Sequence, residues 1–151
     1  MTEFTTNIEE LPADFGAYVL KISLDRTVRL TIPRFDGVRV IPGVYAYVGS
    51  ANGPGGIRAR CRRHLLKKKK RHWHVDHLTT RASRVSAAAF PFGNECKLAD
   101  IIQASCCCEI PVPGFGSSDC PDCSSHLLRI SEPGNLEDIC FNNDDITGKA
   151  G

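Results

Sequence analysis

Two tyrosines and an arginine in the first half of the chain have the chemistry needed to act on a phosphodiester. Tyr18 ends the segment Gly16-Ala17-Tyr18, Tyr47 begins Tyr47-Val48-Gly49, and Arg60 follows in a basic segment. A phenol can accept or relay a proton, and a guanidinium can stabilise negative charge developing on phosphorus oxygens. Tyr45 precedes Tyr47 by two residues, so both phenols would face the same side of a strand. Tyr18, Tyr47 and Arg60 are therefore candidate catalytic residues, with Tyr45 as a secondary candidate.

A histidine and a glutamate extend this candidate set. His64 follows Arg60 by one helical turn, and it could donate a proton to a leaving oxygen, contact a substrate or simply lie on the surface. Glu95 begins a predicted helix, and Mg²⁺ is usually held by one or two carboxylates with water and phosphate oxygens. Alternatively, Glu95 only complements the dipole of that helix. We expect Glu95 to hold one Mg²⁺ or Mn²⁺ ion.

The segment His72-Trp73-His74-Val75-Asp76 supplies further candidates. A carboxylate can orient an imidazole and raise its basicity, so Asp76 could support His74. Trp73 could pack in the core or stack on a nucleic-acid base. We rank His74 and Asp76 as secondary site candidates.

Eight cysteines allow a second kind of site. The absence of an export signal argues against a disulfide framework, which leaves partly buried thiols or a metal site. Cys120 and Cys123 form a C-x-x-C pair, and His126 follows three residues later, a mixture of ligands that Zn²⁺ accepts. The alternative is a tightly packed loop without metal. A structural Zn²⁺ ion is thus a possible second cofactor.

Charge is distributed unevenly along the chain. Between residues 58 and 84 there are eleven Lys or Arg and one acidic residue, whereas residues 1–15 and 131–151 are acidic. A basic middle between acidic ends predicts a surface that faces a polyanion, although a solvated basic helix is the alternative. The candidate nucleic-acid contacts are Arg58, Arg62, Arg63, Lys67 and Lys68.

Periodicity predicts a small α+β domain. Strands are expected at 17–24, 28–32, 38–49 (bent at Pro42-Gly43), 85–90 and 127–130. One helix is expected from 57 to 70, and a second from 94 to 105 with Asn94 as its N-cap. A short helix could cover 72–78, and 106–126 is expected to be an ordered loop. The tyrosines would then lie on a central three-strand mixed or antiparallel sheet flanked by helices.

Several of these segments resemble one known family. The sequence is similar to the GIY-YIG nuclease superfamily, and most similar to its branch of small proteins with an uncharacterised GIY-YIG-like domain. The resemblance extends from about residue 14 to residue 130. It rests on the motifs Tyr47–Gly56, His72–Asp76, Glu95–Ala99, Gly114–Cys120 and Ser125–Leu127.

This resemblance implies a function and roles for residues. In the superfamily the matching tyrosines and the helix arginine form the active site, and a single helix glutamate binds the metal, which implies these roles for Tyr18, Tyr47, Arg60 and Glu95. Ser118 stands near the position of a family asparagine and is a secondary candidate. We expect a metal-dependent endonuclease of the DNA repair or recombination type, with DNA favoured over RNA and a bent or branched substrate. The alternatives are a catalytically weak nucleic-acid-binding module and a zinc-stabilised adaptor.

Size and composition are those of one globular domain. The 151 residues are 42% hydrophobic and 24% charged, and they contain no apolar run of the roughly 18 residues that span a membrane. The N-terminus has no signal-peptide pattern, so we expect a cytoplasmic protein without a membrane partner. The expected organisation is a leader (1–13), a GIY-YIG-like domain (14–130) and an acidic, flexible tail (131–151).

Overall fold

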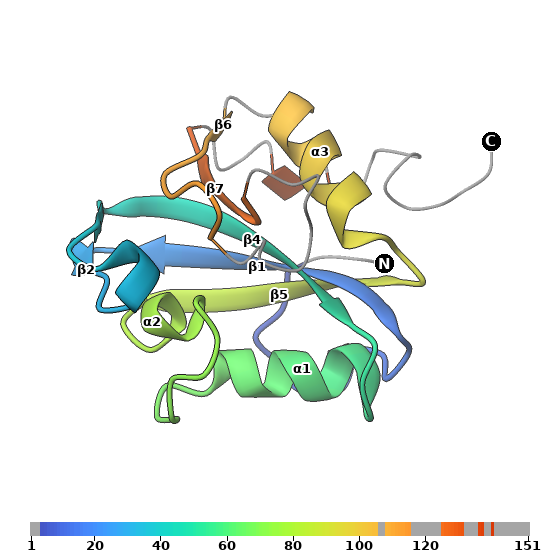
Figure 1. Cartoon of the computed structure of the whole chain (residues 1–151). Helices are drawn as coiled ribbons and strands as arrows, with labels where there is room; N and C mark the ends of the chain where they lie inside the picture. Colours follow the sequence, from blue (N-terminus) through green and yellow to red (C-terminus); the bar gives the residue numbers. More distant parts are fainter. Residues whose placement is uncertain (1–3, 106–107, 116–124, 132–135, 138–139, 141–151) are drawn as a thin grey trace.

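The computed structural model describes residues 4–105, 108–115, 125–131, 136–137 and 140. At its centre is an antiparallel sheet with three long strands (Figure 1). In sheet order these strands are β5 (Arg84–Pro91), β1 (Gly16–Leu24) and β4 (Gly43–Ala51). Two short strands, β7 (Leu127–Ile130) and β6 (Cys108–Glu109), extend the sheet beyond β4. The predicted small α+β class is confirmed.

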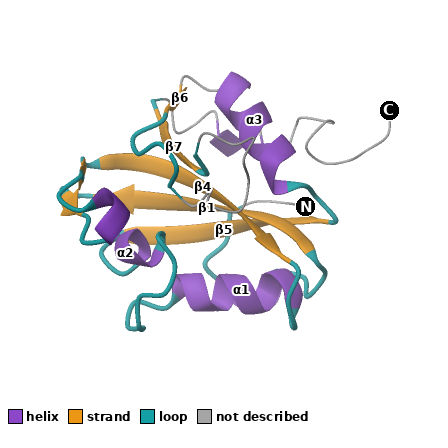
Figure 2. Ribbon diagram, in the orientation of Figure 1, coloured by secondary structure: helices purple, strands orange, loops and turns teal. Residues whose placement is uncertain are grey.

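Helices cover both faces of this sheet (Figure 2). One face carries α1 (Gly56–Leu65) and α2 (Asp76–Thr79), and the opposite face carries α3 (Glu95–Ser105). The described residues therefore form three layers, with the sheet in the middle. The remaining elements are the paired strands β2 (Val28–Arg29) and β3 (Arg39–Val40) and the 3-10 turns η1 (Ile8–Glu10) and η2 (Pro33–Phe35).

Side chains alternate between two cores along each long strand. Tyr18 on β1 and Tyr47 on β4 belong to the core that includes Ile57 of α1, whereas Val19 and Val48 belong to the core under α3. All four strand residues are buried. Because both faces of the sheet are covered, the two tyrosine side chains are largely shielded from water. The neighbouring protein groups therefore determine the chemistry of each hydroxyl.

Helix α1 ends earlier than the sequence predicts. The first helical N–H groups are satisfied by the chain before β1, since Ile57 N donates to Asp14 O and Arg58 N to Pro12 O, both at 3.0 Å. At the other end the helix stops at Leu65, not at residue 70. The reason is that Lys69 folds back and its Nζ donates to two carbonyls of the last turn, those of Arg63 (2.8 Å) and His64 (3.0 Å). The lysine run is therefore outside the helix.

Two further expectations change in detail. The predicted bent strand 38–49 is two separate strands, β3 and β4, divided at Pro42, which has no N–H for a sheet hydrogen bond. The predicted loop 106–126 contains the short strand β6, which pairs with β7. The other predicted strands and the helix starting after Asn94 are confirmed, with 28–32 reduced to β2.

The described ends of the chain are joined to this domain. Leu11, in the predicted leader, is buried, and Thr5 forms an isolated bridge with Ala87 of β5. Leu136 and Cys140, in the predicted tail, are buried in the core under α3. The core therefore also includes described residues that lie outside the range 14–130.

A buried carboxylate joins α1, α2 and the segment between them. Asp76 is fully buried, and its Oδ2 accepts from the Arg63 guanidinium (2.7 Å) and from the backbone N–H groups of His72 (2.7 Å) and Trp73 (2.9 Å). The Lys69 ammonium lies 3.7 Å from Oδ1. Burial raises the pKa of Asp76, but the two amides and then the two cations outweigh it, so the net pKa is lowered. Asp76 is a structural anchor.

We expect Asp76→Asn to lower the free energy of unfolding by roughly 3 kcal/mol, because it leaves Arg63 and the buried Lys69 without a counter-charge. Since the folded pKa lies below the unfolded value of 3.8, the stabilisation is complete above that value and disappears as pH falls through the folded pKa. Urea unfolding at several pH values should therefore show the difference between the two proteins narrowing in acid. Asp100→Asn, exposed on α3, is the control. A difference that stays constant at all pH values would contradict this role.

Candidate functional site

The five predicted catalytic and metal-binding residues meet in one cleft. Its volume is about 270 Å³. They come from β1, β4, α1 and α3, and are Tyr18, Tyr47, Arg60, His64 and Glu95. The remaining lining residues are Gly49, Ser50, His72, Trp73, His74 and His126. Residues up to 108 positions apart in sequence thus share one small space with both signs of charge and several imidazoles.

The cleft lies beside the start of strand β7. β7 pairs with β4 only from Val44 to Tyr47, and a last hydrogen bond joins Val48 N to His126 O at 2.9 Å. Beyond this point β4 continues to Ala51 without a β7 partner. Glu95 can therefore reach the α1 side of the sheet from the start of α3, where Asn94 Oδ1 accepts from Lys97 N (3.0 Å) as the predicted N-cap.

A short hydrogen bond links the sheet to α1 inside the cleft. Tyr18 Oη and His64 Nε2 are 2.7 Å apart, and both side chains are buried. Burial, followed by the charge of Lys69, lowers the pKa of His64 to about 3, so the imidazole is neutral at physiological pH. Burial also raises the pKa of Tyr18 well above its usual value. Both shifts keep the proton on the phenol, so the pair is a fixed hydrogen bond between a protonated phenol and a neutral imidazole.

Tyr47 is protonated as well. Burial raises its pKa, the Glu95 charge raises it further, and Arg60 only partly opposes these effects. Its ring centroid lies 6.3 Å from those of both His64 and Phe115. The charge of Arg60 lowers the pKa of Tyr47, but burial and the charge of Glu95 outweigh it. In this state the phenols can donate hydrogen bonds, and His64 Nε2 is the hydrogen-bond partner of Tyr18.

Arg60 is held by an aromatic ring. Its guanidinium carbon lies 4.6 Å from the centre of the Trp73 ring, and that of Arg63 lies 4.7 Å from the same centre. The ring of Trp73 also lies 5.5 Å from that of His64. Trp73 therefore forms a wall of the cleft and supports Arg60. This position differs from both sequence-based alternatives, which were core packing and stacking on a nucleic-acid base.

Glu95 has a histidine beside it that the sequence assigned elsewhere. His126 Nδ1 lies 3.7 Å from Glu95 Oε2, and with Cys96 these residues place potential metal-binding atoms within 4.8 Å of one another. Cys96 is disulfide-bonded, so its sulfur is not a thiolate ligand, although the absence of an export signal had argued against a disulfide framework. Cys120, Cys123 and Ser118 lie outside the described residues.

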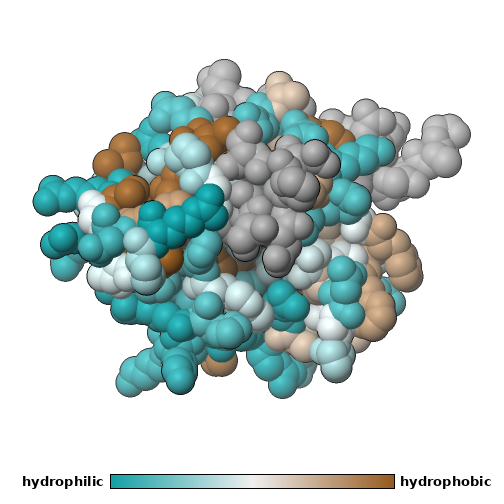
Figure 3. Space-filling view, in the orientation of Figure 1, coloured by the Kyte–Doolittle hydropathy of each residue, from teal (hydrophilic) through white to brown (hydrophobic). Residues whose placement is uncertain are grey.

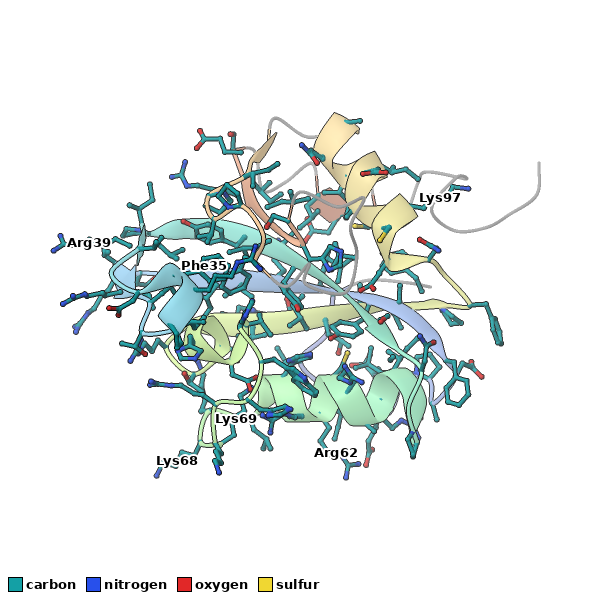
Figure 4. All side chains as sticks on the ribbon, in the orientation of Figure 1. Phe35, Arg39, Arg62, Lys68, Lys69 and Lys97 are labelled. Atoms are coloured by element: carbon teal, nitrogen blue, oxygen red, sulfur yellow. The ribbon has the colours of Figure 1, made fainter. Side chains whose placement is uncertain are left out.

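The predicted nucleic-acid contacts divide into two groups. Arg58 Nε donates to Leu11 O (2.7 Å), Arg63 pairs with Asp76, and Lys67 Nζ donates to Ala82 O. These three cations stabilise the fold. In contrast, Arg62 and Lys68 are exposed and project away from the sheet (Figure 4). Figure 3 shows mainly hydrophilic residues on the lower part of the molecule, where α1 lies.

The secondary site candidates His74 and Tyr45 differ in whether they line the cleft. His74 lines the cleft, and its ring lies 5.2 Å from that of Phe35 and 5.4 Å from that of Phe115. Burial, and then the charge of Arg34, lowers the pKa of His74. Tyr45 does not line the cleft, because its hydroxyl donates to Ile41 O at 2.6 Å. Burial raises its pKa, so Tyr45 is a core residue.

Sequence reasoning missed three contributors to the site. His72 and Ser50 line the cleft, and His126 faces Glu95. No local sequence pattern identifies His126 as a neighbour of Glu95, which lies 31 positions earlier. Their proximity depends on the register between β7 and β4. The neighbouring C-x-x-C pair was the stronger local signal and pointed to a different set of ligands.

Comparison with known proteins gives a family for this chain. Residues 17–145 match the family described as a domain of unknown function, DUF123. The match covers most of the chain, so the protein belongs to this family. No curated protein and no solved structure matches the sequence. Within the described residues, none of the helices has the length and apolar character of a membrane span.

A substitution at Gly49 tests how tightly the site is packed. A Cβ atom at this position would overlap Tyr18 Oη and Cζ, whereas a Cβ at Gly53 would meet nothing within 4 Å. We expect Gly49→Ala to lower the free energy of unfolding by about 1–3 kcal/mol and to displace the Tyr18–His64 pair. Thermal unfolding and the histidine NMR signals would report both changes. Gly53→Ala is the matched control, and equal behaviour of the two variants would show that the Tyr18 ring is not confined.

Proposed function

We propose that the protein is a metal-dependent endonuclease of the GIY-YIG type, which hydrolyses phosphodiester bonds in nucleic acid. The supporting observation is that Tyr18, Tyr47, Arg60, His64 and Glu95 line one cleft although they come from four different elements. Each was singled out from sequence for phosphodiester chemistry before the fold was considered. Convergence of this kind is not required by packing, because a core needs no charged residues.

The residues of the cleft divide the work of the proposed reaction. Arg60, held against Trp73, would bind the phosphate and stabilise the charge that develops on its oxygens. His64 is neutral and hydrogen-bonded to Tyr18, so it would orient the phenol, which keeps its proton because its own pKa is raised and that of the imidazole is lowered. Tyr47, with its raised pKa, would donate a hydrogen bond to the phosphate or to the attacking water.

The cleft suits a divalent ion at Glu95. The Glu95 side chain is one quarter exposed, so it is accessible from the cleft, and among the described residues that line the cleft it carries the only carboxylate. One carboxylate with open positions for water and phosphate is how proteins commonly hold Mg²⁺ or Mn²⁺. When bound, the ion would supply Lewis-acid stabilisation of the phosphate. Glu95 would hold it, and the phenols and Arg60 would orient the phosphate.

The proposed substrate is DNA with an accessible, distorted backbone. The cleft is small and opens beside the end of β4, so it can receive a phosphate with its sugar but not an undistorted duplex groove. The exposed cations Arg62 and Lys68 lie on α1 and just beyond it, where they can contact flanking phosphates. A nucleic-acid-binding module that lacks efficient cleavage is the second candidate, because it needs only this basic surface.

Glu95→Gln should reduce metal-dependent nicking of supercoiled plasmid or branched DNA by about a hundred- to thousandfold, because it removes the anionic ligand at similar size. Tyr47→Phe and Arg60→Ala should cause losses of the same order. Combined variants should lose less than the product of the single effects, as groups that act together do. Rates are measured with Mg²⁺ and with Mn²⁺.

The matched control is Lys97→Gln, an exposed residue in the same turn of α3 (Figure 4). It should keep full activity. DNA binding in the presence of a chelator should survive Glu95→Gln, which separates lost chemistry from lost binding. Full activity of Glu95→Gln would exclude the metal role, and wild-type protein that binds DNA but cuts with none of several divalent ions would favour the binding module.

The double variant Arg62→Ser/Lys68→Ser should weaken DNA binding and flatten its salt dependence. Each lost phosphate contact should reduce the slope of log affinity against log salt by about 0.9. Fluorescence anisotropy across a salt series gives that slope. Arg39→Ser/Lys97→Ser removes two exposed cations from other elements and should leave the slope nearly unchanged. Equal effects of both pairs would mean that α1 is not the main contact surface.

A further inference from the structure

His126 is a buried polar side chain whose imidazole makes no hydrogen bond with any described residue. The residue is 2% exposed, and Nε2 is buried without a partner. Its Nδ1 has Glu95 Oε2 as a neighbour at 3.7 Å, beyond the range of a hydrogen bond. Buried polar groups are almost always satisfied, and Nδ1, the ring nitrogen that faces Glu95, makes no hydrogen bond with a described residue and is therefore available to a ligand.

The backbone fixes where this imidazole lies. His126 N donates to Phe115 O and His126 O accepts from Val48 N, both at 2.9 Å. The residue is thus held directly before β7, at the point where the sheet opens into the cleft. Glu95 is fixed on the opposite side by the N-cap of α3. Both side chains line the cleft, so an ion could enter between them.

The separation of the two groups fits a shared ion. Ligand atoms about 2.1 Å from one ion are about 3.0 Å apart when they are adjacent in an octahedron and about 4.2 Å apart when they are opposite. The observed 3.7 Å is longer than the adjacent separation by about 0.7 Å, so small side-chain rotations would bring both atoms to adjacent positions on one ion without a change of backbone. Cys96 belongs to the same cluster, but its disulfide excludes it as a thiolate ligand.

We infer that His126 is a second protein ligand of the ion at Glu95, which makes the site selective for a first-row transition ion such as Mn²⁺ over Mg²⁺. This inference rests on the proposed metal role of Glu95. Mg²⁺ takes oxygen ligands and gains little from an imidazole, whereas transition ions bind nitrogen well. His126 would therefore set which ion the enzyme uses, and the neighbouring phenols and Arg60 would be unaffected.

The test measures coordination directly, in the absence of DNA and of reductant. Wild-type protein loaded with Mn²⁺ should show nitrogen modulation from one imidazole in its electron spin echo envelope. The modulation should vanish in His126→Leu and persist in His74→Asn, a matched control because His74 also lines the cleft. Leucine is suitable because the imidazole it replaces has no hydrogen bond among the described residues.

Affinity separates a ligand from a structural residue. His126→Leu and His126→Asn should weaken Mn²⁺ binding at least about tenfold, while Mg²⁺ binding, measured by competition, stays unchanged. Equal loss for both ions would assign His126 a structural role and overturn the inference. Mn²⁺ bound without nitrogen modulation, or with modulation that survives His126→Leu, would also overturn it while leaving Glu95 as the ligand. Failure of wild type to bind or to use any divalent ion would instead remove the proposed nuclease and this inference together.

Discussion

The carboxylate of Asp76 has no exposure to water, and it ties together three parts of the chain that would otherwise be separate. It accepts hydrogen bonds from the amides of His72 and Trp73, pairs with Arg63 of α1 and lies close to the ammonium of Lys69. A buried charge is stable only with partners of this kind, so the segment after α1 has to fold back. That return places Trp73 beside Arg60 and His64, and the wall of the cleft depends on it.

The cleft combines groups that would be incompatible in a simple core. The two phenols and the imidazole of His64 are buried in neutral form, while Arg60 and Glu95 lie at the more open side. Burial raises the pKa of both tyrosines and lowers that of His64 in the same step. A protonated donor next to a neutral acceptor results mainly from this common cause, and the charge of Lys69 adds to it at His64.

An incomplete sheet is what gives the site an opening. If β7 were as long as β4, its backbone would cover Gly49 and Ser50 and would separate Glu95 from the tyrosines. The pairing between β4 and β7 instead stops at His126, the residue just before β7. The N-terminus of α3 lies on the other side of the resulting gap. Gly49 serves the same purpose, because any side chain there would meet the Tyr18 ring. The proposed function needs the exposed edge of β4, whereas an edge selected for stability alone would be covered by a neighbouring strand.

Sequence alone was sufficient where the physical signal is local. Alternating apolar residues predicted β1, β4 and β5, Asn94 predicted the start of α3, and the types of Tyr18, Tyr47, Arg60, His64 and Glu95 predicted a shared chemistry. The sequence-based predictions were wrong where contacts between residues distant in sequence determine the structure.

The end of α1 depends on Lys69 folding back, and the burial of Leu136 and Cys140 depends on the core under α3. The cations of 58–68 look equivalent in sequence, but only tertiary contacts commit Arg58, Arg63 and Lys67 to the fold and leave Arg62 and Lys68 to solvent. The approach of His126 to Glu95 was likewise decided by strand register, because no spacing along the chain encodes a contact made across two elements.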